Sequence, residues 1–203
     1  MNRRRLLQSM AASAAVGCTG TSTGDCPATD EQIEGPYYFD AEATRIDITE
    51  GKSGIPLTLY LQVVDADDCT VIVDAEVDVW QADADGIYSG YEVMSTEGET
   101  FLRGIQLTDS NGECQIDTIF PGFYEGRTSH IHIKVRATGY AELTTQLYFP
   151  KAAITAVAPE YPAVDEYTTN KEDGFYDVDN EMEVSGDTTS GYAATHAIAI
   201  RLE

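Results

Sequence analysis

Residues 130–136 read His-Ile-His-Ile-Lys-Val-Arg, and this short run decides the class of the fold. Apolar and polar side chains alternate along it, which is the period of a β-strand that turns one face toward a core. We therefore expect one face of this strand to carry only Ile131, Ile133 and Val135. His130 and His132 then share the opposite face with the two basic residues of the run.

Other parts of the chain repeat this strand character between turn sequences. The segments concerned are residues 57–63, 75–82, 114–119, 144–149 and 196–202. Turn-forming runs separate them, such as Asp-Ala-Asp-Gly at 83–86 and Asp-Ser-Asn-Gly at 109–112. We find no segment of useful length with helical periodicity beyond the first residues of the chain. The pattern predicts an all-β fold, a two-sheet β-sandwich with long loops in a single domain.

Residues 151–192 differ from the rest of the chain. This stretch is acidic and has little strand pattern, yet it carries Tyr161, Tyr167, Phe175, Tyr176 and Tyr192. A loop of such length in a compact domain is usually functional or disordered, and the aromatic residues argue against disorder. We interpret it as a wall over a pocket.

The first residues have the features of an export signal. Residues 3–5 are three arginines followed by a short apolar, alanine-rich run, and Ala15-Val16-Gly17-Cys18 resembles a lipoprotein cleavage site. We predict a twin-arginine signal peptide at 1–17, a lipid on Cys18, a flexible tether at 18–33 and the folded domain at 34–203. The protein would be exported to the periplasmic or extracellular face and anchored to the membrane by that lipid. Ordinary cleavage without lipid attachment is the alternative.

The charge of the chain limits its partners. The net charge is −23, from 12 basic and 35 acidic residues. Removal of residues 1–17 takes away three arginines and no acid, so the remaining chain has 9 − 35 = −26. A surface this negative repels phosphates, and we exclude nucleic acid as a partner.

We expect the cysteines to have structural rather than catalytic roles. If Cys18 carries lipid, three cysteines remain: Cys26, Cys69 and Cys114. An exported protein permits one disulfide with one thiol left over, and the sequence leaves the pairing open. No two of these residues have zinc-ligand spacing.

The two histidines of the 130–136 run suggest a metal site. A buried structural histidine is expected on the apolar face of a strand, whereas His130 and His132 lie on the other face, side by side on a rigid element. The alternative is a solvent-exposed, inert pair. Cysteine ligands and a suitably spaced carboxylate are missing, and the nearest candidates are Tyr88 and Tyr124, each directly after a turn. Two phenolates would offset most of the charge of Fe(III).

Three sequence runs resemble one family. Residues 79–88 (Val-Trp-Gln-Ala-Asp-Ala-Asp-Gly-Ile-Tyr), 118–124 (Thr-Ile-Phe-Pro-Gly-Phe-Tyr) and 127–132 (Arg-Thr-Ser-His-Ile-His) are similar to segments of the intradiol ring-cleavage dioxygenases and occur in the same order. Shorter matches begin at Glu34 and extend over nearly the whole domain. The resemblance implies a non-haem iron enzyme that opens catechol-type rings.

The resemblance also implies roles for individual residues. Tyr88, Tyr124, His130 and His132 would hold Fe(III), and Tyr124 would leave the metal and take a proton when the diol binds. Arg127 would stabilise negative charge on the ring during attack by O₂, although a surface salt bridge is its structural alternative. Gln146 would line the substrate pocket. The substrate would be a small aromatic diol, and the product a cis,cis-muconate-type diacid.

Two other functions compete with this interpretation. A non-catalytic β-sandwich lipoprotein that binds carbohydrate or protein could contain the same turns, but it would not need two same-face histidines together with Tyr88 and Arg127. A zinc hydrolase could use the histidine pair, but the sequence offers no third ligand of the ordinary kind. His196, in the last strand segment, is expected to be structural.

Overall fold

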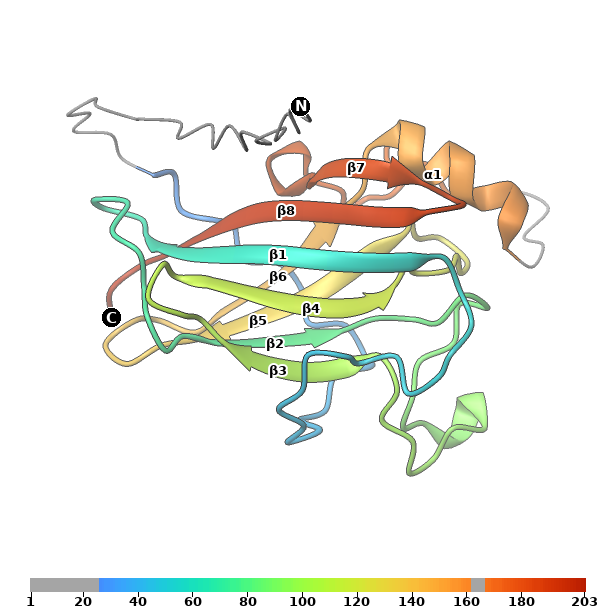
Figure 1. Cartoon of the computed structure of the whole chain (residues 1–203), viewed down its shortest axis with the longest axis horizontal. Coiled ribbons are helices and arrows are strands. Elements are labelled where there is room, and N and C mark those ends of the chain that lie inside the picture. The colour runs from blue at the N-terminus through green and yellow to red at the C-terminus, as the bar shows by residue number, and fades with distance from the viewer. Residues whose placement is uncertain (1–25, 162–166) are drawn as a thin grey trace, which may run out of the picture.

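The computed structural model describes residues 26–161 and 167–203, which form two stacked β-sheets (Figure 1). Each sheet has four strands, which confirms the all-β, two-sheet sandwich expected from the sequence. The strands are β1 (Pro56–Asp65), β2 (Glu76–Trp80), β3 (Arg103–Leu107), β4 (Glu113–Ile119), β5 (His130–Arg136), β6 (Leu143–Tyr148), β7 (Glu183–Asp187) and β8 (Gly191–Ile200). The helical elements are α1 (Lys151–Val157) and the 3-10 turns η1 (Glu92–Met94), η2 (Ala158–Glu160) and η3 (Val178–Asn180).

The two sheets differ in how far apart their strands lie in the sequence. The β1 sheet has the order β4-β1-β8-β7, and in it β1 pairs in parallel with β8, close to the end of the chain. The β5 sheet has the order β3-β2-β5-β6 and is antiparallel throughout. The strand that carries both histidines is therefore an inner strand, with paired neighbours on each side.

The core lies between the sheets and follows the alternation in the sequence. Leu57, Leu59, Leu61 and Val63 of β1 are almost completely buried. They face the three apolar residues of β5, which are fully buried as well. Burial of a side chain of this kind contributes about 1.5–3 kcal/mol, so this layer is the main source of stability.

The second face of β5 is buried too. His130 is 2% exposed, His132 3% and Lys134 6%. The alternation of residues 130–136 therefore separates two buried faces, one apolar and one polar, rather than a core face and a solvent face. The exposed, inert alternative for the two histidines is excluded.

Residues 26–39, which we call the N-terminal segment, cover part of this polar face. The Thr145 hydroxyl donates to the Asp30 carbonyl, the Gln146 amide donates to the Ile33 carbonyl, and Lys134 pairs with Glu34 at 2.5 Å. The expectation of a flexible tether up to residue 33 was therefore wrong for residues 26–33. Backbone hydrogen bonds hold these residues against the sheets, so the domain begins at least as early as residue 26. The signal peptide at 1–17, Cys18 and the rest of the expected tether lie outside the described residues.

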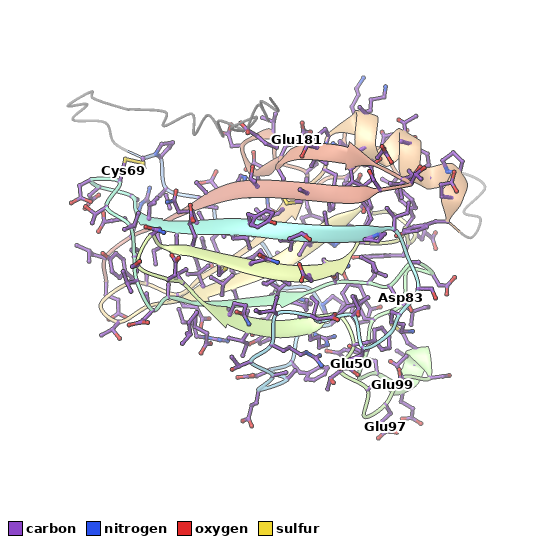
Figure 2. The ribbon with its side chains drawn as sticks, viewed as in Figure 1. Glu50, Cys69, Asp83, Glu97, Glu99 and Glu181 are labelled. Carbon is purple, nitrogen blue, oxygen red and sulfur yellow. A yellow bond between two sulfur atoms is a disulfide. The ribbon has the colours of Figure 1, made fainter. Side chains whose placement is uncertain are left out.

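A disulfide fixes the start of the N-terminal segment. Cys26 and Cys69 are bonded, and Cys114 is a buried free thiol, in line with the expected single bridge. Cys69 lies at one end of the sandwich, whereas Asp83, where the turn before Tyr88 begins, lies toward the other end (Figure 2). The covalent anchor and the tyrosine turns are thus well separated.

The sequence did not reveal three regular elements. Helix α1 contradicts the expectation of no useful helix; it buries only Ala153, Ile154 and Val157, too few positions for a recognisable period. Strand β3 shows no alternation of apolar and polar side chains, because Gly104 in it has no side chain. The backbone there lies close to Ile48, and an added Cβ would be 2.5 Å from that residue. Strand β7 is an exposed edge strand within the stretch that we read as a loop.

Length and polarity exclude a membrane-crossing role for any helix that is described in residues 26–161 and 167–203.

Candidate metal centre

The four predicted ligand residues come from three places in the chain. Tyr88 follows the turn after β2, Tyr124 follows the turn after β4, and His130 and His132 stand two residues apart on β5. In the turn after β2, the Asp83 carboxylate accepts hydrogen bonds from the backbone N–H groups of Asp85 and Ile87, both at 3.0 Å. This side-chain turn fixes the backbone directly before Tyr88.

Glycine allows the two tyrosine turns to touch. A Cβ added to Gly86 would lie 2.3 Å from the carbonyl oxygen of Phe123. A Cβ added to Gly122 would lie 2.4 Å from the carbonyl oxygens of Asp83 and Ala84. No other residue type fits at such close approach, so these two glycines bring the tyrosines to one side of β5.

The donor atoms of the four side chains converge. The hydroxyl oxygens of Tyr88 and Tyr124 are 3.5 Å apart, and the Tyr124 hydroxyl is 3.0 Å from His130 Nε2. His130 Nε2 is in turn 3.2 Å from His132 Nε2. Atoms that each lie about 2.0–2.2 Å from one metal ion are themselves about 3.0–3.5 Å apart. The spacing of these four atoms therefore fits a single ion.

The environment orients both imidazoles. His130 Nδ1 lies 2.6 Å from the carbonyl oxygen of Thr128, which can only accept, so Nδ1 carries the proton and the lone pair of Nε2 faces the other donors. The ring of Trp80 stacks on His132, with centroids 4.8 Å apart and an angle of 11°. His132 Nδ1 is buried without a hydrogen-bond partner, whereas its Nε2 points to the centre.

Burial sets the protonation of the site. It lowers the pKa of His130 to about 3 and that of His132 well below its usual value, so both rings are neutral ligands at pH 7. Burial raises the pKa of Tyr88 well above its usual value and raises that of Tyr124 as well. A multivalent cation at the centre would oppose that rise and favour the phenolates.

The donor set narrows the choice of metal. Within residues 26–161 and 167–203, no three His, Cys, Asp or Glu residues are grouped as a metal site would need. The anionic ligands would have to be tyrosines, which are hard oxygen donors and suit a hard trivalent ion. The residues therefore fit Fe(III) better than they fit zinc.

Arg127 is not the surface salt bridge that we considered. Only 12% of its side chain is exposed, and its Nε donates to Asp173 Oδ2 at 2.9 Å. Its Nη2 donates to Gln146 Oε1 at 2.5 Å. Its positive charge also lowers the pKa of the neighbouring histidines, after the larger effect of burial. Arg127 and Gln146 therefore lie together beside the centre.

Sequence reasoning missed several residues around the centre. Asp173 belongs to the acidic stretch, where nothing distinguished one carboxylate from another; Phe175 of the same stretch had been named only as one aromatic residue of the expected wall. Tyr148, whose ring centroid is 6.3 Å from that of His130, was part of a strand pattern. Tyr37 stacks on Tyr88 with centroids 4.7 Å apart, and its segment had been assigned only to a short family match.

Concavity alone would not have located this site. A cavity of about 800 Å³ lies instead over the β1 sheet, lined among others by Tyr60, Gln62, Gln115, Thr195 and His196. None of the four converging side chains lines it. The convergence of donor atoms identifies the centre, because ligand atoms that are packed around one point leave little empty volume.

Comparison with known proteins gives the family of the chain. A family model described as Dioxygenase matches residues 33–171. The chain belongs to the intradiol ring-cleavage dioxygenases. Among curated members of this family, chlorocatechol 1,2-dioxygenase from Cupriavidus pinatubonensis is 33% identical over 150 residues, covering 63% of this chain and 56% of the relative. Catechol 1,2-dioxygenase from Acinetobacter baylyi is 31% identical over 143 residues, covering 59% and 46%. The chain spans about half the length of the curated relatives it matches.

Solved structures of dioxygenases share the fold over most of this chain. An intradiol ring-cleavage dioxygenase from Tetranychus urticae superposes with a TM-score of 0.80 at 31% identity, covering 87% of this chain and 95% of that one. The dioxygenase domain of a dioxygenase–carbohydrate-binding protein fusion from Streptomyces sp. SirexAA-E superposes with a TM-score of 0.70 at 32% identity, covering 87% and 99%. These two neighbours are therefore matched over nearly their whole length.

Proposed function

We propose that this protein is a non-haem Fe(III) enzyme that cleaves a small aromatic diol of the catechol type between its two hydroxylated carbons. Both atoms of O₂ would enter the product, a cis,cis-muconate-type diacid. The observation that carries this proposal is the convergence of two phenol oxygens and two imidazole nitrogens, each 3.0–3.5 Å from the next in the order Tyr88, Tyr124, His130 and His132. Membership of the intradiol family supports it.

Tyr88, Tyr124, His130 and His132 would hold the iron. Bound Fe(III) would supply a Lewis-acidic, redox-active centre that binds the diol oxygens and makes the ring reactive toward O₂. Trp80 and the Thr128 carbonyl keep the two imidazoles in their ligand orientation. Because the imidazoles are already unprotonated, no proton must leave them before they bind a cation.

Tyr124 is the better candidate to accept a proton from the diol. Tyr88 is completely buried, with Tyr37 stacked against it. Tyr124 is partly exposed, and the residues after it, Glu125 and Gly126, are exposed. Its phenolate oxygen could therefore move away from the other donors and take a proton from an incoming hydroxyl group, whereas Tyr88 has no room to do so.

Arg127 would stabilise negative charge that develops on the ring. Its guanidinium group is held by Asp173 and Gln146, so it does not need to reorganise during the reaction. Pre-oriented N–H donors in a site shielded from water stabilise a developing anion more than mobile donors in solvent do. Gln146 would act by holding this group, since both ends of its own amide are hydrogen-bonded.

Colour and metal content test the ligand set. The purified protein should contain about one iron per chain and show a visible tyrosinate-to-iron charge-transfer band. Tyr88→Phe and Tyr124→Phe should each shift or remove that band, whereas Tyr60→Phe, on the other sheet and 46% exposed, should leave it unchanged. A colourless protein with stoichiometric zinc, or one that cannot bind iron, would overturn the proposal.

The site of ring cleavage tests the reaction. Oxygen uptake should be measured with catechol, chlorocatechol, protocatechuate and hydroxyquinol, and the product analysed by mass spectrometry after reaction with ¹⁸O₂. Both labelled atoms should be found in a diacid cut between the two hydroxylated carbons. Cleavage beside the diol would refute the mechanism without refuting the metal site.

We further propose that the protein is exported and anchored by lipid on Cys18. The Cys26–Cys69 disulfide supports an oxidising compartment, because such bonds are rare in a reducing cytosol. Expression of the full chain should give a lipid-labelled, membrane-associated protein outside the cytoplasm. Cys18→Ala should release it to the soluble fraction, and a full-length soluble cytoplasmic product would contradict the proposal.

A further inference from the structure

Asp173 places a buried carboxylate against Arg127. The Asp173 side chain is fully buried, and its Oδ2 accepts both Arg127 Nε and the backbone N–H of Thr128 at 2.9 Å. Its Oδ1 accepts the backbone N–H of Phe175, also at 2.9 Å. With three N–H donors, this carboxylate is well satisfied as an anion. It joins the acidic stretch to the residues that directly precede the strand carrying the histidines.

Further contacts hold the guanidinium group in one place. Gln146 accepts a second hydrogen bond from Arg127, and the Phe175 ring lies under its Cζ at 4.9 Å. The Tyr148 hydroxyl in turn donates to the Phe175 carbonyl at 2.7 Å, which fixes the segment that brings Asp173 to the site. Arg127 is therefore held along its edge and over its face.

The neighbouring cations of the β5 sheet are engaged as well. Lys134 pairs with Glu34 at 2.5 Å, and Arg136 pairs with Glu142 at 2.8 Å. Arg103 has no carboxylate partner in the part of the chain that the structure describes: its Nε and Nη2 donate to Ser89 and to backbone carbonyl groups, its buried Nη1 has no hydrogen-bond partner, and the residue is only 1% exposed. Among the described residues of this sheet, Lys134 and Arg136 are therefore matched by carboxylates, and Arg103 is enclosed in the protein, where a carboxylate carried by a ligand does not reach it.

Charge balance has a consequence for what can bind. A carboxylate on the ring of a diol that comes within reach of Arg127 would meet a guanidinium group whose charge is already matched by Asp173. Two anions would then share one buried cation, and the unmatched charge would lie in a poorly solvated site. A diol of the same shape without charge would not meet this penalty.

We propose that Asp173 is a positioning and specificity residue: it fixes Arg127 and cancels its charge, so that the site selects uncharged diols over diols that carry a carboxylate. This inference rests on the proposed ring-cleaving function. It concerns the choice between neutral and anionic substrates, which the four metal-ligand residues alone do not determine.

The first test compares two substrates that differ in charge but hardly in shape, 3,4-dihydroxybenzamide and 3,4-dihydroxybenzoate. The iron-loaded wild-type protein should have a kcat/KM for the amide that is roughly 100-fold higher, the size of one charge–charge interaction at about 6 Å in a protein. The ratio should persist at about 0.15 M salt, where repulsion from the acidic surface is screened beyond about 8 Å.

The second test changes the carboxylate. Asp173→Asn should raise the acid-to-amide ratio of kcat/KM by at least about 10-fold, since one negative charge is removed beside Arg127. Asp179→Asn removes the same charge from an exposed position in the same segment and should leave the ratio unchanged. Asp173→Glu keeps the charge but displaces it, so kcat should fall while the ratio stays at its wild-type value.

The outcomes separate this inference from the proposed function. If the wild-type protein cleaves no diol, the proposed function fails. If it cleaves diols but treats acid and amide alike, or prefers the acid, charge selection is refuted. An Asp173→Asn ratio equal to that of the wild type would assign Asp173 a purely structural role. If Asp173→Asn does not fold, the acid-to-amide ratio of kcat/KM of the wild-type protein still tests the inference, because a ratio near one overturns it.

Discussion

The two faces of β5 are buried to the same degree but have opposite chemistry. One face packs Ile131, Ile133 and Val135 into the core between the sheets, and it is covered by a regular partner, β1 and its neighbours. The other face carries His130 and His132, and irregular segments cover it: the two tyrosine turns and the N-terminal segment. Regular alternation thus specifies stability on one face, whereas the function of the other depends on loops from distant parts of the chain.

The largest effect is expected from breaking the polar face. His132→Ala removes one of the four converging donors, and we expect loss of stoichiometric iron and a fall in ring-cleaving activity of more than about 100-fold, beyond what loss of a supporting contact to a metal ligand causes. Iron analysis and oxygen uptake measure this. The far-ultraviolet circular dichroism should stay that of the wild type, and loss of the β signal would mean that the polar face also holds the fold.

Breaking the apolar face should have the converse result. Ile133→Ala leaves a cavity at a completely buried position, and the free energy of unfolding should fall by about 2–5 kcal/mol. Denaturant unfolding measures it. Under conditions where the variant is folded, its iron content per chain should equal that of the wild type. A variant with wild-type stability but no iron would contradict the view that the apolar face provides stability and the polar face binds the metal.

The disulfide should matter more for the covering of the polar face than for the core. Replacing Cys26 and Cys69 together by Ser should lower stability by about 2–4 kcal/mol. Hydrogen exchange should accelerate first in residues 28–38 and only later in β1, because the bridge holds the N-terminal segment. Cys114→Ser, which breaks no bridge, is the control. Equal acceleration of hydrogen exchange in residues 28–38 and in β1 would show that the N-terminal segment does not open independently of the core.

A smaller effect is the pH dependence of stability, because burial shifts the pKa values of His130 and of Asp78 on the neighbouring strand β2 in opposite directions. In the metal-free protein, burial lowers the pKa of His130 to about 3, below its unfolded value, so stability is lost as pH falls below about 6.5. Burial raises the pKa of Asp78 to about 6, above its unfolded value, so its contribution is present at low pH and is lost as pH rises from about 4 to about 6.

These two opposing effects partly cancel between about pH 4 and pH 6. Asp78→Asn removes one of them, so the loss of stability on acidification should become steeper, by about 1–2 kcal/mol over that range. Urea unfolding of the metal-free protein at several pH values gives the slope. An unchanged slope would mean that Asp78 has its ordinary pKa in the folded protein.

The sequence predicted those features that depend on short-range pattern. Alternation in residues 57–63 and 130–136 placed the core correctly, and the turn residues Gly86 and Gly122 marked the loops that bring the tyrosines together. Helix α1 and strand β7 escaped notice, because one is too short for a period and the other is exposed at an edge. For such elements the tertiary context decides the conformation, and a local pattern carries little information.

The supporting residues of the site could not have been found in the same way. Asp173 and Arg127 are 46 residues apart, and their contact depends on how the acidic stretch folds back over β5. Nothing in the composition of that stretch singled out Asp173. The N-terminal segment poses the same problem, because its hydrogen bonds join residues more than 100 positions apart.

The parallel pairing of β1 with β8 has a consequence for how the molecule is made. Strand β1 pairs with β4 on one side, but on the other side residues 57–65 find their partners only at residues 192–200, so the β1 sheet cannot close until β8 has left the ribosome. The β5 sheet is built from strands between residues 76 and 148 and can assemble earlier. We expect the β1 sheet to close later than the β5 sheet and to form slowly, as long-range strand pairing generally does. A chain shortened by its final strand would leave β1 with an unpaired edge and would be prone to aggregate.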